Sequence, residues 1–447
     1  MQDLAERDSL TGAANRRMFQ VTLERTLAAQ AGDDDERRMS AVLFIDLDDF
    51  KVINDSLGHA AGDSLLIAVT DRIGGLVRNG DLVARLGGDE FAILTEDVAD
   101  LRHSRAMAER LVRDLRVPYV IGDHTITCSA SIGIAGARDA GRDAAEVVRN
   151  ADVAMYMSKA NGKSGFAVFD PGMHASIRAR HELGAELQHA VDRGQLRLVY
   201  QPIVSLESGR ISGLEALVRW QHPDRGLVAP GEFIEIAEEN GAILPIGRWV
   251  LREACTQARN LQERYVLTPP LHMAVNLSAR QLQRPEIVGE IAEILLETEL
   301  SPHSLVLEIT ESVMMQDMDL SIQRLAELKE LGVRLAVDDF GTGYSSLNYI
   351  RRFPVDILKV DKSFVDGVNE GGEESALTAA IIELAGILRL RPVAEGIERA
   401  DQLEKLLALR CDLGQGFYFA KPLPLEGVDE LLTTRQTLAT RENELST

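Results

Sequence analysis

The stretch "LVARLGGDEFAIL", residues 82–94, holds two short apolar runs apart by two glycines and two carboxylates. Gly87 and Gly88 permit backbone conformations that other residues disfavour, so the pattern predicts two strands joined by a tight turn. Asp89 and Glu90 then set two negative charges side by side at that turn. Glycine and aspartate are also common in ordinary turns, so the hairpin alone does not indicate a ligand.

The segment "FIDLDDFKVINDSLGHAAGD", residues 44–63, gives the hairpin a second interpretation. Asp46 ends an apolar strand, where an unpaired charge is costly. If this strand lies beside the hairpin, Asp46 faces Asp89 and Glu90, and three carboxylates repel one another. Mg²⁺ relieves such repulsion, because it takes one or two carboxylates together with substrate phosphates as ligands. The glycines of the turn would let a triphosphate approach the backbone.

Composition limits the function classes that remain. A chain of 447 residues is long enough for about two or three domains. The net charge of -22 argues against a nucleic acid polymer as partner, since such binding needs basic surface. The three cysteines are far apart and form no CxxC pair, which indicates a reducing compartment and no structural zinc. Without a signal-like N-terminus or a stretch that could span a bilayer, we expect a cytoplasmic chain.

The order of expected elements divides the chain into segments. Helices alternate with an antiparallel hairpin over residues 1–170, which predicts an α+β sheet domain. Residues 171–195 are expected to form one connecting helix. Strands and helices then alternate regularly over residues 196–434, which is the right length for a βα barrel. Residues 435–447 form a polar tail. The fold class is therefore α/β with two domains.

In the expected barrel, polar residues recur at the ends of six strands. Any single one of them could simply be a strand cap. Several converging carboxylates, however, repel one another strongly unless a cation lies among them. A set of oxygen donors without histidine or cysteine suits Mg²⁺ or Mn²⁺ rather than zinc. The residues are Glu215, Asn276, Glu308, Asp338 with Asp339, Lys359 and Glu395.

The first segment resembles the GGDEF family of diguanylate cyclases. "GGDEF" at 87–91, "DSLTGAANRR" at 8–17 and the stretch 44–63 are similar to three separate family motifs. The resemblance implies a palm-like α+β sheet related to nucleotidyl cyclases. It also implies the joining of two GTP molecules into cyclic di-GMP by a homodimer, because each domain binds one GTP.

The resemblance also implies roles for individual residues of this segment. Mg²⁺ or Mn²⁺, as one or two ions, would be held by Asp46, the Leu47 carbonyl, Asp89 and Glu90, with Asp89 also accepting the proton of the attacking hydroxyl. Lys163 stands where the family often has arginine, so a bidentate phosphate contact is lost. The "RNGD" pattern of Arg78 and Asp81 corresponds to an inhibitory product site. Guanine and phosphate contacts are implied for Asn54, His59, Asp63, Lys51, Lys159 and Lys163.

The second segment resembles the EAL family of cyclic di-GMP phosphodiesterases. "EAL" at 215–217, "DDFGTGYSSL" at 338–347 and "GQGFYFAKPLP" at 414–424 are similar to its motifs. The resemblance implies a modified TIM barrel that hydrolyses cyclic di-GMP to linear pGpG with two ions of Mg²⁺ or Mn²⁺. One ion would be held by Glu215, Asn276, Glu308 and Asp338, and the other by Asp338, Asp339 and Glu395.

Further roles in this segment follow from the same resemblance. Lys359 would position or polarise the attacking water, and Arg219 would contact a phosphate. Gln201 and Gln415 would face the substrate or orient the site. Glu311 would hold the loop of "DDFGTGYSS" in place. Asp361 and Glu398 would support the residues that bind the metal ions and the substrate.

Three functions remain open at this point. The chain could synthesise and degrade cyclic di-GMP, or it could be a phosphodiesterase whose GGDEF domain binds GTP as a regulator. A non-enzymatic cyclic di-GMP receptor would be expected to lack metal ligands, and none of these ligands is missing. Proteins of this kind usually carry a sensor, so we expect an upstream region outside this chain, which could also anchor it to a membrane.

Overall fold

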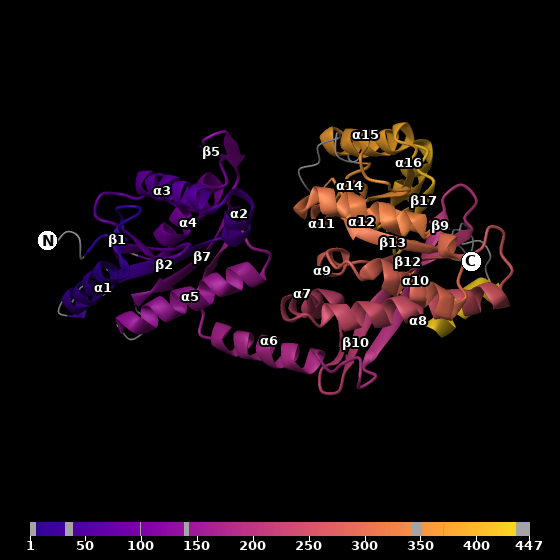
Figure 1. Cartoon of the computed structure of the whole chain (residues 1–447), viewed down its shortest axis with the longest axis horizontal. Helices are drawn as coiled ribbons and strands as arrows, with labels where there is room; N and C mark the ends of the chain where they lie inside the picture. Colours follow the sequence, from indigo (N-terminus) through magenta and orange to yellow (C-terminus); the bar gives the residue numbers. More distant parts are fainter. Residues whose placement is uncertain are drawn as a thin grey trace, which may run out of the picture. The chain divides into compact units, whose positions relative to one another are not determined.

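The computed structural model describes residues 6–31, 39–98, 100–137, 143–341, 351–369 and 371–434. The chain forms two compact units, with the division between His181 and Glu182 inside helix α6 (Met173–Leu187) (Figure 1). This helix is shorter than the predicted helix over 171–195. After α6 the chain makes turns, and Gly194 takes a left-handed conformation that redirects it into the first strand of the second unit.

The first unit is built on a sheet of six strands that confirms the expected α+β fold. The hairpin predicted from residues 82–94 is present in this sheet, and a small separate hairpin, β5 with β6, lies outside it. In sheet order the strands are β1 (Ala14–Asn15), β3 (Leu82–Gly87), β4 (Glu90–Val98), β2 (Met39–Leu47), β7 (Ala130–Gly136) and β8 (Phe166–Val168), and the separate pair is β5 (Tyr119–Ile121) and β6 (His124–Ile126).

Helices pack on both faces of this sheet because strand β2 is apolar on both sides. Leu43 and Ile45 belong to one core cluster, whereas Val42 and Phe44 belong to the other. Successive strand residues point to opposite faces, so a continuous apolar run needs cover on each. The first cluster is shared with α3 and α4, and the second with α1 and α5. The helices are α1 (Arg16–Ala31), α2 (Phe50–Leu57), α3 (His59–Leu76), α4 (Leu101–Leu115) and α5 (Ala144–Ala160).

The second unit is a closed barrel of eight strands, as the sequence predicts. Strand β9 runs antiparallel to both of its neighbours and closes the barrel between β10 and β17. The other barrel strands are parallel, so this is a TIM barrel modified by one reversed strand. The strands are β9 (Leu196–Ser205), β10 (Ile211–His222), β12 (His272–Asn276), β13 (Leu305–Thr310), β14 (Arg334–Phe340), β15 (Ile357–Val360), β16 (Arg391–Ala394) and β17 (Leu413–Gly414), and β11 (Gly226–Val228) extends the sheet beyond β10.

Helices surround the barrel (Figure 1). Its interior is filled by side chains in layers. A buried apolar layer consists of Ile203, Ala274, Val306, Ala336, Ile357, Val393 and Leu413. The surrounding helices are α7 (Pro230–Asn240), α8 (Ile243–Arg264), α9 (Ala279–Leu282), α10 (Ile287–Thr298), α11 (Glu311–Gln316), α12 (Met318–Glu330), α14 (Lys362–Asp366), α15 (Glu373–Ile387), α16 (Ala400–Ala408) and α17 (Leu425–Thr434), with a short 3₁₀ turn at Pro302–Ser304.

This apolar layer determines where polar side chains can lie. Because strand residues alternate, the positions two residues before and two residues after each member also face the barrel axis. The positions toward the carboxyl ends of the strands are where TIM barrels carry their chemistry. Elsewhere, none of the described helices is long and apolar enough to cross a membrane. Cys128, Cys255 and Cys411 are buried free thiols.

Candidate active site

In the first unit, the apolar strand does lie beside the hairpin. Asp46 is opposite Glu90 in the antiparallel register of β2 and β4. The Leu47 amide donates to the Asp89 carbonyl at 3.3 Å, which ties the end of β2 to the turn. The structure therefore brings Asp46, Asp89 and Glu90 to one end of the sheet, as the sequence predicts.

Asp46 is the most buried of these three carboxylates, and its environment favours an additional cation. The pKa of Asp46 is raised to about 6, because burial and the neighbouring Asp89 and Asp48 raise it more than Lys159 lowers it. The Lys159 ammonium lies 2.6 Å from Asp46 Oδ1. A single lysine therefore does not fully compensate the charge, and a bound metal ion would lower the pKa of this carboxyl group.

The "DSLTGAANRR" motif holds the hairpin in place, a role that sequence reasoning did not assign. Arg16 donates to the Leu86 carbonyl at 3.0 Å and pairs with Glu90 at 3.2 Å. Arg85 pairs with Asp8 at 3.0 Å and donates to the Gly88 carbonyl. Gly88 has a φ of 54°, in the left-handed region where glycine is unstrained. The motif thus fixes a turn that glycine alone would leave free.

Asp48 is a second residue that sequence reasoning missed. Its buried carboxylate accepts hydrogen bonds from the hydroxyls of Ser129 and Ser131, both at 2.7 Å, and from the Ser164 amide at 3.0 Å. These bonds hold the loop that carries Lys163 against the end of β2. Lys163 itself pairs with Asp49 at 2.8 Å and is exposed. The second aspartate in "FIDLDDF" was the available signal.

The predicted guanine contacts lie on α2 and α3. Asn54 is half-buried on α2, whereas His59 and Asp63 are exposed on α3. A Cβ added at Gly62 would lie 1.9 Å from Asn54 Oδ1, so only glycine at this position leaves room for the amide. The close packing of the two helices therefore sets the position of Asn54. Lys51 is also exposed on α2.

The predicted product site forms a turn with internal partners. Arg78 Nε lies 3.3 Å from Asp81 Oδ1, and the Arg78 amide donates to Asp81 Oδ2 at 3.2 Å. The Arg78 guanidinium also donates to the carbonyl of Glu96. A ligand at this site would therefore have to compete with, or add to, contacts that the arginine already makes.

In the second unit, a buried lysine lies at the centre of the polar layer. Lys359 Nζ is 2.7 Å from Glu395, 2.8 Å from Glu308, 3.0 Å from Asp338 and 3.7 Å from Glu215. Four of these five residues lie two positions beyond a member of the apolar layer: Glu308 on β13, Asp338 on β14, Lys359 on β15 and Glu395 directly after β16. The residues predicted from strand ends therefore form one cluster on the barrel axis.

The prediction for Glu215 needs one correction. Glu215 lies in the middle of β10, and not at the end of a strand, because β10 continues beyond the barrel as a ribbon with β9 and β11. The carboxylate still reaches the axis, since it accepts from Asn276 at 2.9 Å and from Gln415 at 2.7 Å. Gln201 is opposite Glu215 on β9 and donates to the Ala420 carbonyl at 3.3 Å. These contacts connect the first strands of the second unit to its last segment at the site.

A bulge in β14 brings Asp339 into the site beside Asp338. The register between β14 and β15 shifts between Val337 and Phe340, and Asp339 takes a left-handed φ of 53°. Bulges re-aim side chains, and such strain in a residue other than glycine is concentrated at functional sites. Oxygen atoms of Asp338, Asp339 and Glu395 lie within 4.8 Å of one another, which is compatible with a shared metal ion.

The pKa values of this cluster reflect an excess of negative charge. Burial, reinforced by Glu215, raises the pKa of Glu308 well above its usual value. Burial also raises the pKa of Glu395 to about 8, against the opposing effect of Lys359. Burial alone would lower the pKa of Lys359, but the carboxylates around it raise that pKa well above normal. One ammonium group therefore compensates only part of the carboxylate charge.

The predicted supporting residues lie in separate networks. Glu311 accepts from the Gly341 amide at 3.1 Å, and the rest of its predicted loop, 342–347, lies outside the described residues. Asp361 caps α14 by accepting from Ser363 at 3.0 Å. Arg219 lies further along β10, half-buried, and donates to the Val218 carbonyl at 2.8 Å.

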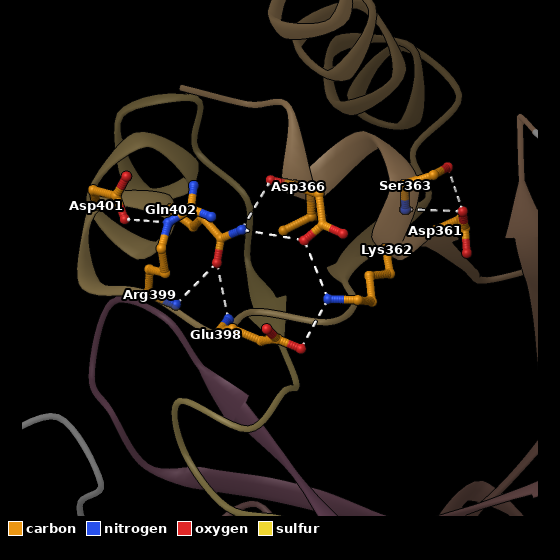
Figure 2. Close-up of polar contacts among 9 residues, drawn as sticks. Asp361, Lys362, Ser363, Asp366, Glu398, Arg399, Asp401 and Gln402 are labelled. Carbon is orange, nitrogen blue, oxygen red and sulfur yellow. Dashed lines mark hydrogen bonds and ion pairs between the residues drawn. The ribbon is translucent and has the colours of Figure 1, made fainter. Parts of the chain in front are cut away.

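Glu398 belongs to a network whose central residue sequence reasoning missed (Figure 2). The carboxylate of Glu398 pairs with Lys362 at 2.8 Å. The amides of Glu398 and Arg399 both donate to the buried Gln402 side chain at 2.9 Å, and Gln402 donates to the Val365 carbonyl at 3.3 Å. Gln402 therefore connects the segment that follows Glu395 to α14 and α16.

Family comparisons agree with both halves of this description. A model of the GGDEF domain family, described as diguanylate cyclase, matches residues 5–165. A model of the EAL domain family matches residues 185–422, which is more than half of the chain. The chain belongs to the EAL domain family. It carries a GGDEF domain ahead of the EAL domain, and these are the domains of cyclic di-GMP turnover.

Curated relatives match most of this chain. MucR of Pseudomonas aeruginosa, a bifunctional diguanylate cyclase/cyclic di-GMP phosphodiesterase, is 42% identical over 423 residues, which cover 95% of this chain and 61% of MucR. The cyclic di-GMP phosphodiesterase NbdA of the same organism is 40% identical over 440 residues, covering 97% of this chain and 54% of NbdA. This chain thus spans between about half and three fifths of the length of these relatives.

Solved structures support the fold of each of the two domains. The PaMucR phosphodiesterase in complex with c-di-GMP is 42% identical, with a TM-score of 0.53, and covers 55% of this chain and 99% of that chain. Vibrio cholerae LapD, as an S helix-GGDEF-EAL structure bound to c-di-GMP, is 18% identical with a TM-score of 0.65 and covers 93% of this chain and 96% of that chain. At that identity LapD supports the fold alone.

The donor set of the EAL domain fits divalent cations. Domains of both families generally depend on such ions. The cluster offers carboxylate oxygens and one amide, which suits Mg²⁺ or Mn²⁺. The raised pKa values of Glu308 and Glu395 indicate that the site without metal lacks positive charge. The residues present therefore fit the group that the family implies.

Proposed function

We propose that the EAL domain hydrolyses cyclic di-GMP to linear pGpG with two divalent cations, Mg²⁺ or Mn²⁺. The observation that carries this proposal is the cluster of four carboxylates within 3.7 Å of the buried Lys359. A structural role does not account for so many buried acids around one ammonium, because uncompensated buried charge is costly. The cyclic di-GMP complex of the related PaMucR barrel supports the choice of substrate.

The proposed ligands divide between two ions that share Asp338. One ion would be held by Glu215, Asn276, Glu308 and Asp338, and the other by Asp338, Asp339 and Glu395. When bound, the two cations would supply a water of lowered pKa and stabilise charge that develops on the phosphate.

The chain's own residues would orient this reaction. Lys359 donates to the surrounding carboxylates and keeps them in position, with its ammonium close to the place where the attacking water would lie. Gln415 bridges Glu215 and Glu395 through one amide nitrogen, at 2.7 and 3.3 Å, and so fixes two ligands at once. Arg219 would bind a substrate phosphate, and Gln201 would hold the segment after Gln415.

We further propose that the GGDEF domain joins two GTP molecules into cyclic di-GMP as a homodimer. Asp46, the Leu47 carbonyl, Asp89 and Glu90 would hold the metal, and the residues of α2 and α3 would hold guanine. A second candidate is that this domain only binds GTP and regulates the EAL domain. Lys163 stands in place of the expected arginine and pairs with Asp49 at 2.8 Å. Lysine does not make the bidentate phosphate contact of arginine, so we expect weaker triphosphate binding, which supports this second candidate.

Nucleotide chromatography separates these functions. The purified chain is incubated with Mg²⁺ and GTP, with Mg²⁺ and cyclic di-GMP, or with cyclic di-GMP and a non-hydrolysable GTP analogue. Synthesis is expected to yield cyclic di-GMP or pGpG from GTP, and Asp89→Asn is expected to abolish it. Hydrolysis is expected to yield pGpG, and Glu215→Gln is expected to abolish it without slowing the consumption of GTP, so that cyclic di-GMP accumulates from GTP and no pGpG forms.

The outcomes distinguish the candidates. No product from GTP, together with faster hydrolysis when the analogue is present, would make the GGDEF domain a regulator. Unchanged hydrolysis in Glu215→Gln would overturn the assignment of the barrel site.

A further inference from the structure

The amino ends of the barrel strands, opposite the acidic cluster, form a cavity of about 410 Å³. It is lined by Ile357 of the apolar layer and by several charged residues from the starts of neighbouring strands and the segments before them. This end of a TIM barrel ordinarily serves stability and not chemistry. The polar lining residues are His303, Lys329, Arg334, Asp356 and Arg391, of which the lysine, the two arginines and the aspartate carry charge.

Two arginines face this cavity because of their register. Arg334 and Arg391 are the first residues of β14 and β16, two positions before Ala336 and Val393 of the apolar layer. Strand alternation therefore directs both side chains to the same side as that layer. The two strands flank β15, where Ile357 is paired with both Ala336 and Arg391. Two guanidinium groups from residues far apart in sequence thus converge.

The acidic residue of the cavity does not balance these arginines. Asp356 accepts two contacts from Lys329, at 2.7 and 2.8 Å, and a third from the Leu335 amide at 2.8 Å. Within the described part of the chain, the Arg334 guanidinium has no hydrogen-bond or ion-pair partner. Arg391 has only a long contact of 3.7 Å to Asp412, and both side chains are about half exposed. The cavity therefore carries excess positive charge.

A buried histidine lies close enough to this cavity to interact electrostatically with both arginines. His272 begins β12, two residues before Ala274 of the same apolar layer. Burial, together with Arg334 and Arg391, lowers the pKa of His272 to about 4. Gly213 on β10 accommodates the ring, since a Cβ there would lie 2.4 Å from His272 Nε2. The fold thus keeps a neutral histidine beneath two arginines instead of supplying a carboxylate.

We propose that this cavity binds the phosphate group of a small phosphorylated molecule. Arginine is suited to this ligand, because its planar guanidinium donates two parallel hydrogen bonds to phosphate oxygens. The converging charges repel one another in a chain whose net charge is -22, and an anion would remove that repulsion. The volume falls in the range of small-molecule sites and accommodates a mononucleotide. The site is separate from the acidic cluster and does not depend on its function.

The test is isothermal titration calorimetry of the full chain in EDTA, which removes the divalent ions that could hold phosphates elsewhere. Three probes are titrated separately at constant ionic strength: inorganic phosphate, pyrophosphate and GMP. We expect saturable binding of at least one probe with one site per chain. Arg334→Gln is expected to weaken that binding at least tenfold. The ranking of the three probes would show whether a free phosphate or a nucleotide is the ligand.

Matched variants separate binding from general charge and from folding. Arg248→Gln on α8 removes the same charge from a half-exposed residue that pairs with Glu293, and binding is expected to stay unchanged. Arg391→Gln, at a more exposed position, serves as a second variant if Arg334→Gln does not fold. Arg334→Lys is expected to retain part of the affinity. The proposal would be overturned if none of the three probes showed saturable binding. It would also be overturned if Arg334→Gln and Arg391→Gln bound the probes as tightly as the unmodified chain.

Discussion

Lys359→Met tests whether one ammonium group holds the acidic cluster together in the absence of metal. Methionine has a similar volume but no charge, so the change removes the cation and leaves four buried carboxylates facing one another. Removing one partner of a buried ion pair costs about 3–5 kcal/mol. In EDTA, we therefore expect the free energy of unfolding of the barrel to fall by about 3–5 kcal/mol.

Divalent cations should reverse much of this loss, because they would replace the missing positive charge. At a metal concentration of about 100 times the dissociation constant, binding to the folded state stabilises it by about 2.7 kcal/mol. Hydrolysis of cyclic di-GMP should nevertheless stay impaired, since the metal does not replace the ammonium next to the water. The stability of Lys359→Met is thus expected to depend more steeply on Mn²⁺ than that of the unmodified chain.

Urea unfolding followed by tryptophan fluorescence measures this effect for the barrel alone. The chain has two tryptophans, Trp220 and Trp249, and both lie in the second unit. Lys405→Met on α16 is the control, and we expect its stability to stay within about 0.5 kcal/mol. A loss below about 1 kcal/mol in Lys359→Met with EDTA would refute the argument that the carboxylates need this cation.

Three further changes have expected outcomes. Gly62→Ala forces Asn54 to move, so we expect about tenfold weaker binding of a GTP analogue by calorimetry, whereas Gly74→Ala on the same helix meets no atom within 4 Å and should bind normally. His272→Met should remove a loss of stability in acid. In the unmodified chain the folded pKa of His272, about 4, lies below the unfolded value of 6.5, so this contribution to stability is full above pH 6.5 and falls by about 3 kcal/mol toward pH 4. Urea unfolding of both proteins at the two pH values would measure the difference. Gln402→Leu leaves the amides of Glu398 and Arg399 unpaired and should cost about 2 kcal/mol in the same assay; an unchanged transition would exclude a structural role for this network.

Local patterns were sufficient to predict the main elements of both sites. The glycines and carboxylates of 82–94 predicted the hairpin, and an apolar strand ending in Asp46 predicted its neighbour. Polar residues after apolar strands predicted the cluster around Lys359, because the axis of a barrel forces such positions together. These predictions rest on periodicity, which a sequence displays directly.

The features that were missed depend on contacts between distant segments. The bulge that directs Asp339 into the site interrupts strand alternation, so a periodic sequence pattern does not predict this bulge. Glu215 lies in mid-strand because β10 pairs with β9 beyond the barrel, which only the tertiary fold decides. Asp48 and Gln402 bind groups on segments distant in the sequence, so their partners could not be predicted even where the residue itself stood in a recognisable motif.

The measurement that tests the central claim most directly is an anomalous-diffraction map of crystals of the full chain soaked in Mn²⁺. The account predicts two peaks about 3.5–4 Å apart in the barrel. Asp338 is expected to lie between the two ions, with Glu215 and Glu308 on one side and Asp339 and Glu395 on the other. A map without a peak among these carboxylates, with Lys359 still paired to Glu308 and Glu395, would contradict the assignment of this cluster as a two-metal site.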